Sequence, residues 1–212
     1  TYTSSRDGTG NPQQKVCKMF IEHQPQIAEY AIKSPDNMCR VMDMVSLSIQ
    51  QPWHNVGTML KDVDDSGIES KYLFGSKRPG FEYTRYNKHN LYNVIFYKDM
   101  TLEERLLHVA GTPGLGLPKA GFVLQLCTGE VGCLDVHNLN RFGLSPNVFK
   151  LARKVKYDTA LKKAHLYIKT LEDLGGCEYL WNSWCVFMAD KYPNRYRDAD
   201  HVSQLHVDYV VK

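Results

Sequence analysis

The sequence predicts a mostly α-helical protein. Several segments repeat apolar residues every three or four positions, as one face of a helix does, whereas the strict alternation of a β-strand is scarce. Residues that start and end helices flank these segments, and the chain contains no internal repeat. With 212 residues, of which 43% are hydrophobic and 23% charged, the chain is long enough for one sizeable core or for two small subdomains that share one.

The first predicted helix begins at Ser34-Pro35-Asp36 and should end near Gln50-Gln51-Pro52, where proline breaks it. Residues 62–100 are expected to be irregular, because they contain glycine-rich turn signals at 64–67 and 77–80. The apolar face of the first helix is predicted to comprise Met38, Val41, Met42, Val45 and Ile49.

A second helix should begin at Thr101-Leu102-Glu103-Glu104, which matches the capping-box pattern. A turn at 111–117 and an apolar helix from about 118 to 127 follow it, so the sequence predicts two helices joined by a tight glycine turn.

Two further helices are expected in the last third of the chain. One carries an apolar stripe over 161–171 and is closed by Gly175-Gly176, and the other covers about 180–189. Trp181 and Trp184 of the last helix are expected to lie in the core.

The first fifteen residues are polar and lack the apolar centre of a signal peptide, and no later apolar run is long enough for a membrane span. The six cysteines are scattered without a Cys-x-x-Cys pair, which favours reduced thiols over a disulfide framework. These features predict a cytoplasmic or nucleoid-associated protein, in the host cytoplasm if the chain is viral.

The net charge is only +3, but the cations are segregated. Residues 141–169 contain eight Lys and Arg against one acid, and residues 71–98 contain six against one. Eight aromatic residues are interleaved with the cations of the second stretch. Such a distribution is typical of a phosphate-binding surface with stacking platforms, so double-stranded DNA is the predicted partner. Solvated helix faces and core aromatics are the alternative for about half of these side chains.

The turn Pro113-Gly114-Leu115-Gly116 is the strongest functional signal. Two closely spaced glycines let the backbone approach a phosphate, and the amides of the following helix N-terminus point outward to receive it. The turn is therefore predicted to grip a nucleic-acid backbone without reading its bases. A monovalent cation held by the carbonyls of Gly114 and Gly116 is a further expectation.

This turn, Ala120 after it and the later Leu134-Asp135-Val136-His137 resemble the helix-hairpin-helix DNA glycosylase superfamily, which includes endonuclease III and the adenine and oxoguanine glycosylases. The family hairpin typically reads Leu-Pro-Gly-Val-Gly-Arg-Lys-Thr-Ala, and Val-Asp-Thr-His follows an apolar helix. The similarity covers residues 101–142, with weaker similarity back to about residue 36.

The resemblance implies a monomer of two helical subdomains with a DNA-binding cleft between them. The first would comprise 36–130, with the hairpin at about 101–127, and the second 12–35 plus 131–212. Some members hold an iron–sulfur cluster on four closely spaced cysteines. Cys177 and Cys185 do not supply that pattern, so no cluster and no required cofactor are expected.

Asp135 matches the family aspartate, which stabilises the positive charge that develops on the sugar when an N-glycosidic bond breaks. The alternative is a cap for a helix that begins near Asn138. In the lyase members a lysine attacks C1′, but an ungapped alignment places Pro118 at that position. One residue rotates a helical side chain by about 100°, so Lys119 should point elsewhere, contact phosphate, or enter the pocket only if the helix starts differently.

Three more residues match positions at which the family contacts DNA. Gln50 and Gln51 resemble the polar run that fills the gap left by a flipped base, although exposed glutamines at a helix end explain them equally well. His137 follows the aspartate as in the family motif and is expected to make hydrogen bonds rather than to act as an acid or base.

The first functional hypothesis is a monofunctional DNA glycosylase, in which water oriented by Asp135 replaces the missing lysine. The second is an enzyme that flips a base and modifies it, because some virus-encoded members resemble enzymes that attach an amine or amino acid to an activated thymine. The third is a DNA-binding module without catalysis, in which the hairpin only anchors phosphate.

Overall fold

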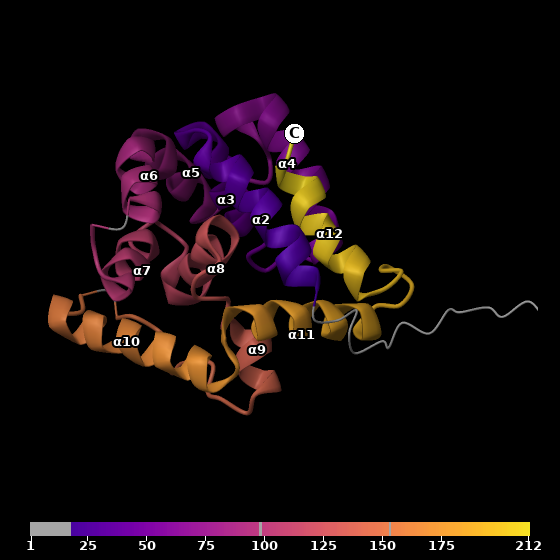
Figure 1. Cartoon of the computed structure of the whole chain (residues 1–212). Coiled ribbons are helices and arrows are strands. Elements are labelled where there is room, and N and C mark those ends of the chain that lie inside the picture. The colour runs from indigo at the N-terminus through magenta and orange to yellow at the C-terminus, as the bar shows by residue number, and fades with distance from the viewer. Residues whose placement is uncertain (1–17, 98, 153) are drawn as a thin grey trace, which may run out of the picture.

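The computed structural model describes residues 18–97, 99–152 and 154–212. Within them the chain forms helices and loops without a strand, which confirms the mostly helical prediction (Figure 1). Residues 1–17, including the start of the predicted second subdomain, lie outside the described residues. The α-helices are α2 (Met19–Ile32), α3 (Pro35–Leu47), α4 (Val56–Ser66), α5 (Lys77–Tyr86), α6 (Lys88–Phe96), α7 (Leu102–Ala110), α8 (Gly116–Thr128), α9 (Val136–Arg141), α10 (Tyr157–Asp173), α11 (Gly176–Lys191) and α12 (Ala199–Val210), and short 3-10 helices cover Trp53–Asn55 and Gly67–Glu69.

Helices α2, α3, α8 and α12 form the centre of the molecule (Figure 1). Helix α2 packs against α3, α8 and α12, and α8 also packs against α3 and α7. Helices α10 and α11 lie along the lower edge of the view, where α10 contacts α7 and α11 contacts α12. Both predicted subdomains contribute side chains to one buried apolar core, and their boundaries stay a prediction.

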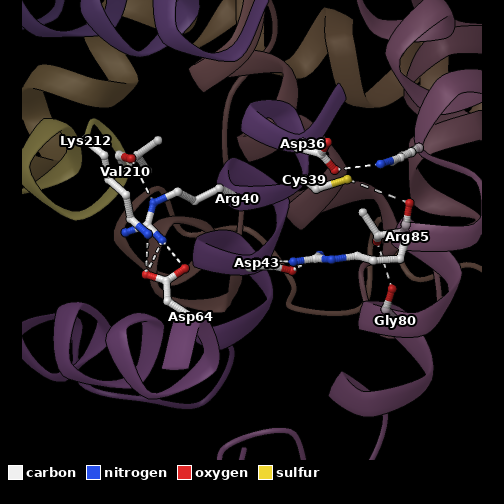
Figure 2. Close-up of polar contacts among 11 residues, drawn as sticks. Asp36, Cys39, Arg40, Asp43, Asp64, Gly80, Arg85, Val210 and Lys212 are labelled. Carbon is white, nitrogen blue, oxygen red and sulfur yellow. Dashed lines mark hydrogen bonds and ion pairs between the residues drawn. The ribbon is translucent and has the colours of Figure 1, made fainter. Parts of the chain in front are cut away.

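Arg40, a partly buried residue, ties α3 to α4 and α12 (Figure 2). Arg40 of α3 forms an ion pair with Asp64 of α4, and it donates hydrogen bonds of 2.8 Å to the carbonyls of Tyr209 and Val210 in α12. These contacts fix α4 and the end of α12 against α3.

The expectation that residues 62–100 are irregular is wrong, because this region contains α4, α5 and α6. Pro79 lies in the first turn of α5, where a helix needs no backbone donor, so it does not interrupt the helix. Gly80 is a packing position: a Cβ there would lie 2.6 Å from the carbonyl oxygen of Pro113. The absence of a side chain thus lets α5 approach the predicted hairpin turn.

The first predicted helix also ends earlier than expected. Helix α3 ends at Leu47, and Gln50 has a positive φ of 55°. This left-handed backbone is uncommon outside glycine and often marks a constrained, functional segment. Residues 48–52 therefore form a tight turn that leads into Trp53 rather than a final helical turn.

Candidate functional site

The predicted hairpin is present. Both hydrogen bonds of the capping box form at the start of α7: the Thr101 amide donates to the Glu104 carboxylate at 2.8 Å, and the Glu104 amide donates to the Thr101 hydroxyl at 3.2 Å. The chain then turns through Gly114 and Gly116, which have φ of 88° and 65°, and α8 begins at Gly116. Both glycines are needed for these backbone angles.

The two glycines of the turn have different surroundings. A Cβ on Gly114 would lie 2.8 Å from the Ser76 hydroxyl oxygen, so this glycine packs against the segment before α5. A Cβ on Gly116 would meet nothing within 4 Å, so this side of the turn is open. Gly116 is therefore the position of the turn at which a partner's backbone can approach closely.

The predicted role of Leu115 in DNA binding stays untested, but both its side chain and its amide are engaged within the protein. The side chain is 7% exposed and belongs to the core. The amide donates to the Thr112 carbonyl at 3.1 Å, which closes the turn and leaves no free donor for a phosphate. The cation role of Gly114 and Gly116 stays a prediction.

The prediction that Lys119 points away from the pocket is also wrong. Lys119, Phe122 and Gln125, spaced by one helical turn, form the face of α8 that lines a cavity. The Lys119 ammonium lies 3.4 Å from Oδ2 of Asp135 and 3.9 Å from the Cys133 sulfur. The ungapped alignment failed because α8 presents this face, and not the one with Pro118, to the cavity.

The structure confirms the capping role of Asp135, although α9 begins at Val136 and not near Asn138, and the catalytic role stays a prediction. Its Oδ1 caps α9 by accepting from the amides of His137 at 3.1 Å and Asn138 at 3.2 Å. Its Oδ2 faces Lys119. The two carboxylate oxygens thus have separate tasks: one orients the side chain, and the other places a negative charge beside the lysine.

A close contact between α8 and the segment before α9 sets this geometry. A Cβ on Gly121 would lie 2.3 Å from the Gly132 carbonyl oxygen, so only glycine permits the approach. The hydroxyl of Tyr167, from α10, donates to that same oxygen at 2.6 Å and accepts from the Leu134 amide at 2.8 Å. Tyr167 and Gly121 therefore position the chain that carries Asp135.

The environment of Lys119 favours its protonated form. Burial alone would lower the pKa of the ammonium, but the neighbouring Cys133 sulfur and the Asp135 carboxylate raise it, and the net direction is upward. Burial raises the pKa of Cys133 itself to about 12, so its thiol is neutral near pH 7. Asp135 is consequently the charge that holds the ammonium.

The cavity has a volume of about 690 Å³ and gathers five of the predicted residues. Seven of its 25 lining residues are Trp, Phe or Tyr, and its only acidic residue is Asp135. The predicted residues that line it are Gln50, Gln51, Lys119, Asp135 and His137. The aromatic residues that line it are Trp53, Phe122, Trp181, Trp184, Phe187, Tyr192 and Tyr196.

Sequence reasoning missed most of this wall. Trp181 is a core residue as expected and Trp184 packs against the core, but the sequence did not show that both also line the cavity, and Trp53 and His206 carried no recognised signal. The aromatic run of 72–97 does not line it. The spacing of Trp181, Trp184 and Met188 along α11 gives a stripe on one face, but the sequence does not reveal which neighbour faces the stripe.

Three of the five described cations in the basic stretch of 71–98 have partners on α3, whereas Lys71 and Arg78 are exposed, so a phosphate-binding surface there stays a prediction for those two. Lys77 is 5% exposed and donates to a backbone carbonyl of α3 at 3.3 Å. Arg85 forms a paired hydrogen bond with Asp43, at 2.7 and 2.5 Å (Figure 2). Lys88 lies 2.8 Å from Asp36. These cations stabilise the packing of α5 and α6 against α3.

The stretch of 141–169 keeps more of its charge on the surface. Lys98 and Arg153, which belong to the two stretches, lie outside the described residues. At the cavity itself, Lys191 and Arg195 are exposed cations that contribute to the lining. The exposed lysines of the stretch are Lys150, Lys154, Lys156, Lys162 and Lys169.

Among the described residues, one group has the composition of a metal site. Ligand atoms of Glu22, His23 and Asp200 lie within 4.8 Å of one another, and none of the three lines the cavity. His23 already bonds the Ser203 hydroxyl at 2.7 Å. In the part of the chain that the structure describes, no helix has the length and apolar character of a membrane span.

Comparison with protein-family models, curated proteins and solved structures gave no match for this chain.

Proposed function

We propose that this chain is a DNA base-flipping enzyme that cleaves the N-glycosidic bond of a damaged or modified base. The observation that carries the proposal is the Lys119–Asp135 pair, 3.4 Å apart on the wall of an aromatic cavity of about 690 Å³. A nucleophile beside a carboxylate, in a pocket that accepts a flat apolar ring, is the arrangement that such a reaction requires.

The two side chains have complementary roles in this proposal. Lys119, whose pKa is raised in the free protein, first gives up a proton to solvent and then attacks C1′ as a neutral amine. The new C1′–N bond replaces the glycosidic bond, and the base leaves with that electron pair and takes up a proton from solvent. Asp135 stabilises the positive charge that develops on the sugar. Because Lys119 lines the cavity, the reason for expecting a strictly monofunctional enzyme disappears, and a lysine adduct becomes the expected intermediate.

Residues around the cavity supply the DNA contacts. Gly116 offers an open turn at the N-terminus of α8, which suits a phosphate. Gln50 is exposed and held in a left-handed backbone conformation on the wall formed by the turn after α3. A polar side chain at this place can occupy the space that a flipped base leaves in the duplex.

A second candidate is the modification of a flipped base. The cavity volume of about 690 Å³ lies in the range of pockets that enclose a whole small ligand. Lys191 and Arg195 add exposed positive charge to its lining. The cavity thus has both the volume and the positive charge to bind an anionic second substrate beside the base, and these two features favour a base-modifying enzyme.

Mass spectrometry of duplex DNA after incubation separates the candidates. Release of a free base supports the glycosylase, a gain of mass on a base supports the modifying enzyme, and binding without either supports a non-catalytic module. Lys119→Gln should abolish the reaction. Lys33→Gln is the matched control, because Lys33 forms an exposed pair with Glu29 at the same distance of 3.4 Å. Equal activity of the two variants would contradict the role of Lys119.

A further inference from the structure

His206 of α12 lies at the aromatic end of the cavity, where its ring is fixed on both sides. The ring centroids of Trp53 and Trp181 lie 4.4 and 4.3 Å from its own centroid, and those of Phe122 and Trp184 lie 6.0 and 5.5 Å away in edge-to-face geometry. The side chain is 1% exposed and contributes to the cavity lining. A ring held between two indoles has one orientation toward a ligand.

The hydrogen bonds of this ring determine its tautomer. Nδ1 lies 3.0 Å from the Val202 carbonyl oxygen and 3.2 Å from that of Ser203, so Nδ1 carries the proton and donates. Nε2 therefore has the free lone pair, and no described residue donates to it. Burial lowers the pKa of His206 to about 3, which keeps the imidazole neutral and Nε2 an acceptor at physiological pH.

Gln125 of α8 presents a second acceptor. Its amide nitrogen donates to the Cys177 carbonyl at 3.0 Å, which fixes the amide orientation. The side-chain oxygen then has no donor among the described residues, although the residue is only 3% exposed and lines the cavity. Neither this oxygen nor Nε2 of His206 is among the fully buried unpaired side-chain atoms of the described residues, so both acceptors are accessible from the cavity, where a ligand can supply the donor.

We propose that Nε2 of His206 and the side-chain oxygen of Gln125 select a neutral ligand that presents an N–H donor, such as the ring imide of a uracil-type base or the amino group of a cytosine-type base. This inference rests on the proposed base-flipping function, and it adds the chemical group of the base that the cavity recognises. A cationic ligand is disfavoured because the only acidic residue of the lining, Asp135, already pairs with Lys119.

Free methylated bases test the inference on the full chain without DNA. 1-Methyluracil keeps the ring N–H, whereas 1,3-dimethyluracil lacks it, and 1-methylcytosine and its N4,N4-dimethyl analogue form the second pair. Ligand-observed NMR titration should show at least one donor-bearing compound binding about tenfold more tightly than its partner, because the partner leaves a buried acceptor unpaired. Equal affinities within both pairs, or no binding of either donor-bearing compound, would overturn the inference.

Substitutions then test whether His206 and Gln125 are the residues that recognise the N–H donor. His206→Phe and Gln125→Met should each reduce the tenfold preference to near unity. Gln24→Met is the matched control, because Gln24 is 6% exposed, donates to the Leu126 carbonyl at 3.2 Å and does not line the cavity. A preference that persists in both folded cavity variants would assign the reading to other residues and contradict our proposal.

Because these titrations contain no DNA, their outcome is independent of the reaction. If the protein prefers the compounds that carry an N–H donor but has no activity on duplex DNA, the inference about the two acceptors is supported and the proposed function is rejected. Activity on DNA without discrimination would reject the acceptor pair alone. If a cavity variant fails to fold, the comparison of methylated bases on the unaltered protein still decides the inference.

Discussion

Replacing Asp135 by Asn and by Ala separates its two tasks. Both substitutions remove the negative charge beside Lys119. Asparagine is as good a helix cap as aspartate, and alanine is a poor one. The two amide hydrogen bonds at the start of α9, of 3.1 and 3.2 Å, should therefore persist in the first variant and be lost in the second.

The magnitude of the difference follows from the cap alone. Losing an N-cap side chain costs about 1 kcal/mol, so Asp135→Ala should be less stable than Asp135→Asn by about that amount. Turnover should fall equally in both, by about 10²- to 10³-fold, because the missing charge stabilises only the transition state. Urea denaturation and single-turnover base release measure the two quantities on the same preparations.

Three outcomes would refute this reasoning. Equal stability of the two variants would mean that the cap bonds contribute nothing. Full turnover in Asp135→Asn with loss in Asp135→Ala would show that the orientation of α9 matters and the charge does not. A third outcome concerns Lys119: burial without the carboxylate should lower its pKa, so a lysine-dependent rate that does not shift to lower pH in Asp135→Asn would contradict the pairing.

Three other predictions follow from the same structure. Borohydride trapping on a substrate duplex should give a covalent adduct that maps to Lys119, and an intact abasic strand without adduct would restore water as the nucleophile. Gly116→Val should weaken binding to DNA duplexes of every sequence alike. The control Gly67→Val should not, because Gly67 has a similar φ of 57° and equally open space but lies outside the hairpin. Equal duplex affinity of the two variants would contradict a role of the hairpin in DNA binding. Lowering the pH from about 6.5 toward 3 should destabilise the fold, because His206 takes up a proton only when unfolded. By about pH 4 the free energy of unfolding should fall by roughly 3 kcal/mol, and a folded His206→Phe variant should not show this fall. Urea midpoints measured against pH test this, and parallel profiles of the two proteins would contradict it.

The features that depend on neighbouring residues were predicted correctly from the sequence. The capping box at Thr101 and the glycine turn before α8 depend on neighbouring residues, so the sequence contains all the information that they need. The helical class was predicted for the same reason. Pro79-Gly80 led to the wrong prediction of a loop. A proline in the first turn of a helix and a glycine at a close contact have the sequence pattern of a loop unless the packing partner is known.

The candidate site depends on contacts between distant segments, which local patterns do not reveal. The face of α8 that carries Lys119 follows from how α8 packs against the chain before α9, and Gly121 and Tyr167 set that packing. The acceptor role of His206 follows from its bonds to its own helix and from stacking on Trp53, which is far away in sequence. Neither relation leaves a periodic trace in the sequence.

The Lys119–Asp135 pair is better explained by chemistry than by the needs of the fold. The two side chains are only 16% and 19% exposed, beside a neutral Cys133 thiol and an aromatic wall. Desolvating two charges in such a place costs about as much as their attraction returns, and apolar side chains of similar volume often stabilise a core as well or better. The capping task of Asp135 needs no charge, since serine or asparagine performs it. A lysine held against a carboxylate at the wall of a cavity is therefore the feature on which the proposed reaction rests.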